Sequence, residues 1–103
     1  MTYSTIALRE LDQWIEFGQN MVIVDLRKGN SYRQCHIRGA INLPYESIEE
    51  RFGELPKDKT LIFYCGRGGQ SMRVCQFLSD MGYRTVNVAC GIVHYRGKYL
   101  ESL

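Results

Sequence analysis

The stretch Leu61–Ser71 constrains the fold of this chain more than any other part of the sequence. It begins with four apolar residues, Leu61–Tyr64, which are typical of a buried strand, and Cys65 stands where that strand should end. The glycine-rich turn Gly66–Gly69 follows, and a helical pattern begins at Ser71. A strand, a tight turn and a helix in this order point backbone N–H groups into one concavity, with the positive end of the helix behind them. A thiol placed there is expected to ionise easily, because a field that holds an anion also stabilises a thiolate.

Apolar strands alternate with helical segments along the rest of the chain. Strands are predicted at 21–26, 41–43, 61–64 and 83–88, and helices or helical turns at 4–17 (Ser4 as N-cap), 32–35, 45–52, 71–81 (Gly82 as C-cap) and 91–103. Several strands are apolar throughout, as in strands that are covered on both faces. The alternation therefore predicts a layered α/β domain with a mainly parallel sheet, in which ligands bind beyond the carboxyl ends of the strands.

Composition limits the organisation of the chain and its partners. With 103 residues the chain can form one hydrophobic core, so residues 1–103 are interpreted as a single domain. Thirteen Lys and Arg against eleven Asp and Glu give a net charge of +2 without any basic run, which argues against nucleic acid or an anionic membrane as partner. Residues 1–5 do not resemble a signal peptide, and no apolar run is long enough to span a membrane.

The cysteine pattern favours free thiols. Cys35, Cys65, Cys75 and Cys90 contain no C-x-x-C pair and no zinc-like spacing, so we predict no metal site. Without a secretory signal, reduced thiols and a cytoplasmic location are expected. Cys75 lies on the apolar side of its predicted helix and is expected to be a buried, inert thiol.

Cys65 has two interpretations. A nucleophilic cysteine needs thiolate character, access, and surroundings that tolerate negative charge. Gly66, Gly68 and Gly69 would let the backbone curl so that amide groups face the sulfur, and Arg67 would add a positive charge at the rim. The alternative is a buried cysteine before a loop that only turns the chain. We favour the nucleophile, because a cysteine that leads Gly-Arg-Gly-Gly into a helix is seldom merely structural.

Asp25 and Arg27 place an acid and a base at the end of a second predicted strand. A helix cap formed by Asp25 and a structural ion pair between the two are both favoured over a catalytic role.

The whole chain resembles a single-domain rhodanese, a sulfurtransferase module of the rhodanese superfamily. The resemblance rests on four segments in family order, which are Asp25–Arg27, His36–Pro44, Tyr64–Ser71, and Thr85–Val88 with Gly91 after it. It implies an α/β fold of three layers, in which helices flank a mainly parallel central sheet of about five strands.

The resemblance also implies a mechanism. Cys65, as a thiolate, would take the outer sulfur of thiosulfate or of a persulfide donor. The backbone N–H groups of the loop and the helix dipole would hold the resulting persulfide, and a thiol or a sulfur-accepting protein (cyanide in assays) would remove the sulfur. No metal or organic cofactor is needed. The loop residues concerned are Gly66, Arg67, Gly68, Gly69, Gln70 and Ser71, and the residues expected to support the site are Asp25, Arg27 and His36.

Some residues depart from the family pattern. Gln70 stands where the loop often has a basic residue, Tyr95 where tryptophan is usual, and Cys35 where glycine usually precedes the histidine. Cys90 replaces the first glycine of a Gly-Gly pair. It follows a strand end as Cys65 does, so it is either a simple replacement or a resolving thiol that attacks an oxidised or persulfidated Cys65.

Other functions compete with sulfur transfer. Related cysteine phosphatases and arsenate reductases use a C-x5-R loop whose arginine clamps an oxyanion, but that position here is Ser71, which makes phosphatase activity improbable. A rhodanese-like binding or regulatory module without turnover is the main alternative. A thiol redox protein that uses Cys65 with Cys90 is a weaker one.

Overall fold

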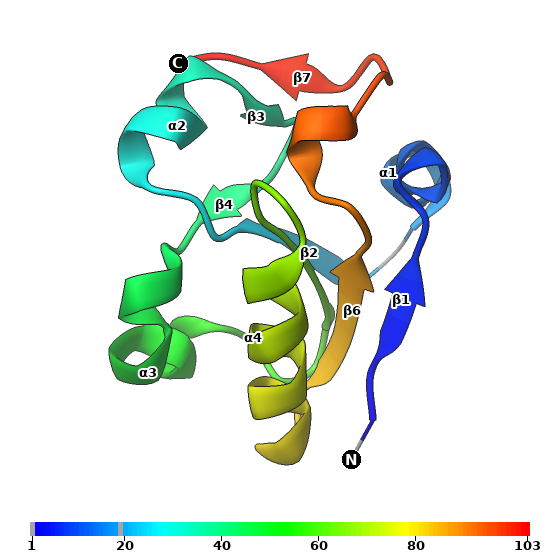
Figure 1. Ribbon diagram of the computed structural model, residues 1–103. Helices are drawn as coiled ribbons and strands as arrows, with labels where there is room; N and C mark the ends of the chain where they lie inside the picture. The colour runs from blue at the N-terminus through cyan, green and yellow to red at the C-terminus, as the bar shows by residue number, and fades with distance from the viewer. Residues whose placement is uncertain (1, 19) are drawn as a thin grey trace.

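One parallel sheet organises the computed structural model, which describes residues 2–18 and 20–103 (Figure 1). Its five strands lie in the order β1-β6-β5-β2-β4, and every neighbouring pair is parallel, as predicted. The strands are β1 (Ser4–Ile6), β2 (Met21–Asp25), β4 (Ile41–Asn42), β5 (Thr60–Tyr64) and β6 (Arg84–Val88). A separate antiparallel pair joins β3 (His36–Ile37) to β7 (Leu100–Glu101).

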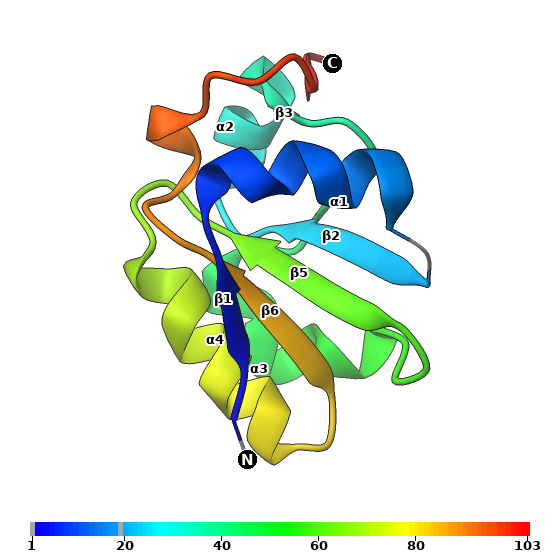
Figure 2. The same cartoon turned by 90° about the vertical axis from the view of Figure 1, so that its right-hand side faces the viewer.

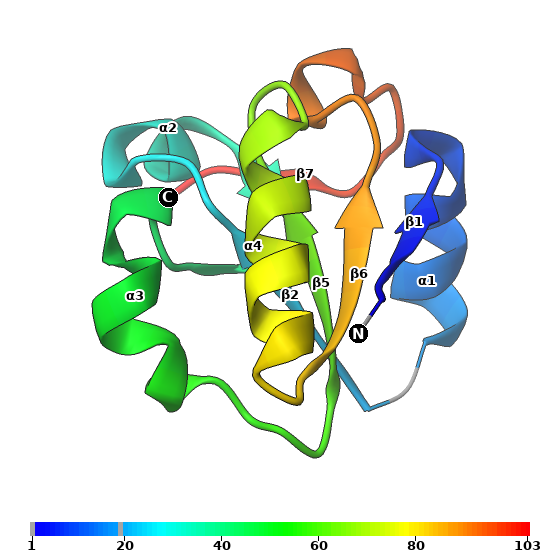
Figure 3. The ribbon, with the colours of Figure 1, turned by 60° about the horizontal axis from the view of Figure 1, so that its bottom comes forward.

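Helices cover both faces of this sheet. Figure 3 shows α3 and α4 on one face, and Figure 2 shows α1 crossing the other. The α-helices are α1 (Leu11–Phe17), α2 (Gly29–Gln34), α3 (Ile48–Arg51) and α4 (Gly69–Asp80), and the 3-10 turns are η1 (Leu8–Glu10), η2 (Tyr45–Ser47), η3 (Phe52–Glu54) and η4 (Ile92–His94). In the part of the chain that is described, no helix has the length and apolar character needed to cross a membrane.

The strand β5 separates two hydrophobic cores. Leu61 and Phe63 pack toward α3 and α4, whereas Ile62 and Tyr64 pack on the opposite side, because successive side chains of a strand point to opposite faces. This explains why the strand is apolar throughout. Cys65 follows in the same alternation and belongs to the core beneath α4.

Two of the predicted helical segments are right only in part, because residues 8–17 and 92–94 are helical while the rest of each segment is not. Ser4 does not cap a helix but opens β1, which pairs with β6 from Ser4 opposite Val86. A strand of three residues is too short to show the alternation of side chains in the sequence. Its pairing with β6 satisfies backbone groups that would otherwise be unpaired at that edge of the sheet. At the C-terminal end, η4 stops at His94 and the chain then extends into β7, which pairs with β3 instead of continuing a helix.

Candidate active site

Cys65 follows the carboxyl end of the central strand β5, and the loop 66–68 separates it from α4. Only 2% of Cys65 is exposed to solvent, although Arg67, Gly69 and Gln70 nearby are exposed. Its carbonyl oxygen accepts a hydrogen bond from the N–H of Ile92 at 2.9 Å. The cysteine is thus fixed at its backbone and surrounded by a loop that faces solvent.

The sulfur of Cys65 has two polar neighbours. The N–H of Gly68 donates to Sγ at 3.0 Å, and the hydroxyl oxygen of Ser71 lies 3.6 Å from Sγ. The helix α4 has twelve residues and begins at Gly69, immediately after this amide. The first N–H groups of a helix have no carbonyl partner within it, so their partial positive charge is directed at the sulfur end of the loop. The loop can therefore stabilise negative charge on sulfur.

Only one of the three loop glycines has a backbone conformation that requires glycine. Gly68 has φ +98°, which residues with a side chain rarely adopt, and this conformation presents its N–H to the sulfur. A Cβ atom at Gly66 or Gly69 would meet no atom within 4 Å, and neither residue has a positive φ. The prediction that all three glycines are needed to curl the backbone is therefore wrong for Gly66 and Gly69.

Gly91 is the glycine at which the segment after β6 touches the loop. It has φ +73°, and a Cβ atom there would overlap the carbonyl oxygen of Gly66. Next to it, the N–H of Val93 donates to that same oxygen at 3.3 Å. The loop thus keeps its shape because a second segment of backbone lies against it.

We expect Gly91→Ala to lower the free energy of unfolding by at least about 2 kcal/mol, because it adds a clash to an unfavourable backbone conformation. The control is Gly53→Ala, where a Cβ atom would meet nothing within 4 Å. Urea unfolding of the two variants measures the difference. Equal stabilities would contradict the close approach of the two segments.

A buried polar cluster joins the ends of β2 and β5. Asp25 is fully buried and forms an ion pair with Arg27 at 2.7 Å. The hydroxyl of Tyr64 donates to Asp25 at 2.7 Å and accepts from the N–H of Ile37 at 3.1 Å. Arg27 also donates to the carbonyl oxygen of Cys35 at 2.5 Å. The cluster ties the end of β5 to the segment around β3.

Of the two structural interpretations of Asp25, the ion pair is present and the helix cap is wrong. The helix α2 begins after Lys28, and Asp25 instead accepts a hydrogen bond from the N–H of Arg27 at 2.8 Å. Burial lowers the pKa of the Arg27 guanidinium, but the hydrogen bond and charge of Asp25 outweigh burial and raise it. Burial, and then the charge of Asp25, raise the pKa of Tyr64. Both groups therefore stay protonated at neutral pH.

His36 lies in β3 and is buried. Its Nδ1 is 2.7 Å from the carbonyl oxygen of Tyr32, and its ring stacks on the Tyr32 ring with centroids 3.9 Å apart. Its Nε2 lies 4.0 Å from a carboxylate oxygen of Glu101 in β7. These contacts fit an organising role for the histidine in this segment.

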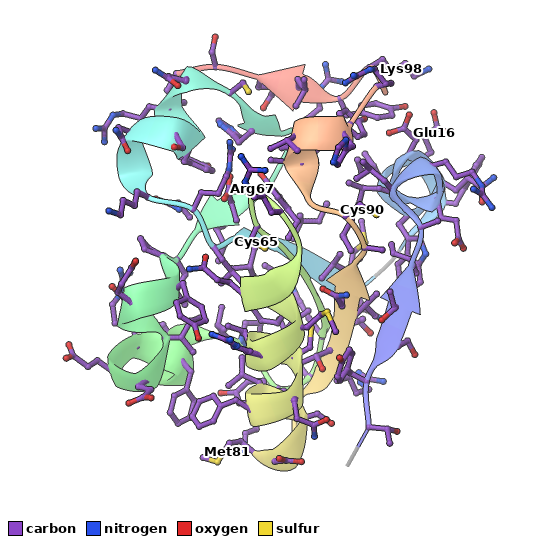
Figure 4. The ribbon with its side chains drawn as sticks, viewed as in Figure 1. Glu16, Cys65, Arg67, Met81, Cys90 and Lys98 are labelled. Atoms are coloured by element: carbon purple, nitrogen blue, oxygen red, sulfur yellow. The ribbon has the colours of Figure 1, made fainter. Side chains whose placement is uncertain are left out.

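Figure 4 shows how the labelled site residues lie. Arg67 projects from the loop above Cys65, whereas Cys90 lies beyond β6 on the side of α1. The backbone of Cys90 nevertheless lies against the loop, because a Cβ atom at Gly68 would be 3.3 Å from its nitrogen. Cys90 is the exposed cysteine of the chain and lines a cavity of about 710 Å³ with residues of the η1–α1 region, among them Arg9 and Asp12. This cavity is lined neither by Cys65 nor by its loop.

Comparison with known proteins identifies the family. Residues 7–98 match the family model described as the rhodanese-like domain, which spans most of the chain. The chain belongs to the rhodanese family. The putative sulfurtransferase YtwF of Bacillus subtilis is 34% identical over 95 residues, covering 92% of this chain and 89% of that protein. The thiosulfate sulfurtransferase PspE of Escherichia coli is 39% identical over 71 residues, covering 67% of this chain and 68% of that protein.

Solved structures show the same fold. The crystal structure of a rhodanese-like domain protein from Staphylococcus aureus superposes with a TM-score of 0.87 at 24% identity, covering 97% of this chain and 98% of that one. The parallel sheet flanked by helices is thus a rhodanese fold.

The remaining cysteines of this rhodanese-like domain differ in their surroundings. Cys75 is buried in α4, as expected, and burial raises its pKa to about 12. Cys35 is half-buried. Cys90 has φ +69°, a left-handed conformation that favours glycine, which fits the glycine expected there in rhodanese sequences.

Sequence reasoning missed one residue next to the rhodanese loop. Asn87 in β6 is 2% exposed, and its side chain contacts the hydroxyl of Ser71 at 2.5 Å. The signal was present, because an asparagine between two valines in a buried strand is polar where an apolar residue would be expected.

Proposed function

We propose that this chain transfers sulfane sulfur through a persulfide on Cys65. The donor would be thiosulfate or a persulfide, and the acceptor a thiol or a sulfur-accepting protein. The observation that carries the proposal is the N–H of Gly68, which lies 3.0 Å from Cys65 Sγ at the start of a twelve-residue helix. The names of the relatives support it, since PspE is a thiosulfate sulfurtransferase and YtwF a putative sulfurtransferase.

Two displacements at sulfur make up the reaction. The Cys65 thiolate attacks the outer sulfur of thiosulfate, the S–S bond of thiosulfate breaks, and sulfite leaves with the electron pair. Cys65 then carries a persulfide whose outer sulfur is negatively charged. An acceptor thiolate attacks this outer sulfur, forms a new S–S bond and releases Cys65 as thiolate. The amides at the start of α4 would favour both anionic states, because they are held in place before charge develops.

The loop favours a small sulfur substrate over a phosphate ester. The position of the phosphatase arginine is Ser71, which is fully buried and hydrogen-bonded to the carbonyl oxygen of Gly68 at 3.0 Å. A neutral side chain that points into the protein cannot clamp an oxyanion as a guanidinium does. We therefore expect no phosphatase activity.

Intact mass after incubation with thiosulfate tests the proposed function. The reduced protein is expected to gain about one sulfur atom, which cyanide removes. Loading by an organic persulfide but not by thiosulfate would keep the mechanism and change the donor. Loading by neither would contradict the proposal and favour a rhodanese-like binding module.

We expect Arg67→Ala to raise the KM for thiosulfate about two- to fivefold while kcat changes less, because an exposed cation at the rim attracts a dianionic donor. The effect should shrink at high salt, which screens such charges. Arg84→Ala is the control, since Arg84 is also exposed but opens β6, at the opposite end of the sheet from Cys65. An unchanged KM in Arg67→Ala would rule out this role for the arginine.

A further inference from the structure

The hydroxyl of Ser71 lies at the centre of a buried polar cluster beneath Cys65. Its Oγ is 3.6 Å from Cys65 Sγ, 3.0 Å from the carbonyl oxygen of Gly68 and 2.5 Å from Oδ1 of Asn87, the amide oxygen, which accepts from it. Ser71 is 0% exposed, and Asn87 and Cys65 are each 2% exposed. Because so little of these groups reaches solvent, the protons of the cluster must be shared among its own members.

Counting protons shows that the cluster has two arrangements. A hydroxyl has one proton to donate, whereas the carbonyl oxygen of Gly68 can only accept. In the structure Asn87 presents its oxygen and accepts the proton of Ser71, so Ser71 can then only accept from the Cys65 thiol. If the amide turns over and presents its NH2 group instead, it donates to Ser71, and Ser71 can donate its own proton to sulfur. An ionised sulfur competes well for this proton, because charged acceptors form stronger hydrogen bonds than neutral carbonyls.

The sheet places Asn87 at this position. Asn87 lies opposite Phe63 in the register of β6 with β5, and its side chain reaches the first turn of α4 through Ser71. Burying an amide in a strand is unfavourable unless it is hydrogen-bonded. An apolar side chain, such as those of the neighbouring Val86 and Val88, would avoid that cost. The asparagine is therefore explained by what it does for Ser71.

We propose that Asn87 is a positioning residue that directs the proton of Ser71, so that Ser71 accepts from the Cys65 thiol and donates to the Cys65 thiolate. Together with the fixed N–H of Gly68, this would give the thiolate a second hydrogen-bond donor. The catalytic significance of the inference rests on the proposed function, in which Cys65 reacts as a thiolate.

The test is the pH dependence of alkylation of Cys65 by iodoacetamide, followed by peptide mass mapping so that the four cysteines are counted separately. In Asn87→Asp, the ionised carboxylate is isosteric but has no NH2 group to present, so it can only accept the proton of Ser71. We expect the midpoint of the pH–rate curve to move upward and the rate at neutral pH to fall about tenfold. Cys75 does not interfere, because burial raises its pKa to about 12.

A double-mutant cycle separates the relay from a direct effect of charge. In the Ser71→Ala background, Asn87→Asp should shift the midpoint by less than half as much, because the intervening hydroxyl is gone. Equal shifts in both backgrounds would show that the carboxylate acts through space alone and would overturn the proposal. An unchanged midpoint in Asn87→Asp would overturn it too.

Thr85→Val is the matched control on the same strand. Thr85 is buried two residues before Asn87 and donates to the carbonyl oxygen of Cys75, not to the Cys65 cluster. Thr85→Val should lower the free energy of unfolding without moving the midpoint of the pH–rate curve of Cys65. If it moved the midpoint as far as Asn87→Asp does, the effect of Asn87→Asp would be explained by lost packing alone. The readout does not need sulfur transfer. If the wild-type chain failed to load sulfur but Asn87→Asp still shifted the midpoint, the proposed function would be rejected and the role of Asn87 would be kept.

Discussion

Replacing Cys65 with serine is expected to abolish sulfur loading and to reduce sulfur transfer at least about a thousandfold, because a hydroxyl does not ionise at neutral pH and cannot form a persulfide. The wild-type chain should gain about one sulfur atom from thiosulfate and lose it to cyanide, while the variant should keep its original mass. The substitution changes a single atom, and the N–H of Gly68 can donate to oxygen as it does to sulfur. The loss would thus report on chemistry and not on folding.

Cys90→Ser is the corresponding control, because it exchanges the same atom at the exposed cysteine. It should load sulfur as the wild type does. Loading that survives in Cys65→Ser and disappears in Cys90→Ser would assign the persulfide to Cys90 and contradict the proposed mechanism. The same variant tests the redox alternative, which requires that mild oxidation form a disulfide between Cys65 and Cys90 and that Cys90→Ser prevent it.

Asp25→Ala is expected to lower the free energy of unfolding by about 3–5 kcal/mol, because it leaves a partly buried cation without its partner. Arg27 would lose its ion pair, and the hydroxyl of Tyr64 would lose the acceptor 2.7 Å away. Loss of either contact loosens the link between the end of β5 and the segment around β3. Urea unfolding followed by tyrosine fluorescence or circular dichroism measures the change.

Two further variants make this prediction specific. Glu54→Ala removes the acid of the exposed pair between Arg51 and Glu54, and its unfolding midpoint should stay nearly unchanged because exposed pairs contribute little. Tyr64→Phe removes only the hydroxyl from the cluster and should cost about 1–3 kcal/mol. If Asp25→Ala were no more harmful than Glu54→Ala, the buried pair would not be holding this end of the sheet.

The central part of the fold could be predicted from the sequence, because there local pattern and tertiary environment agree. Leu61–Tyr64 is apolar on both faces, and the strand is buried on both. The helix after the loop and its end at Gly82 also follow from local signals, and Gly82 has φ +93°. Where an element depends on a partner that is distant in the sequence, the local pattern gives the wrong prediction. Ser4 is the example, because it belongs to a strand that forms by pairing with β6.

The site divides in the same way. The loop that contains Cys65 is contiguous, so its strand, turn and helix are visible in the sequence. The residues that contact this loop come from other parts of the chain. Ser71 contacts Asn87 of β6, and the carbonyl oxygens of the loop accept hydrogen bonds from the segment that follows β6. Periodicity does not show which strands are neighbours. The contact between Ser71 and Asn87 therefore required the sheet order, in which β6 lies beside β5.

The backbone hydrogen bonds from Ile92 and Val93 to the Cys65 loop also order the events of folding. Both donors follow β6, so during synthesis from the N-terminus the ribosome releases the Cys65 loop before it releases the segment that braces it. Before β6 pairs with β5 and Gly91 packs against Gly66, the carbonyl oxygens of Cys65 and Gly66 lack these hydrogen bonds. In the same state Asn87 does not contact Ser71. A nascent chain can thus expose this cysteine before it has the surroundings that the proposed sulfur transfer requires. Full competence for sulfur transfer would then be one of the last properties that the folding chain acquires.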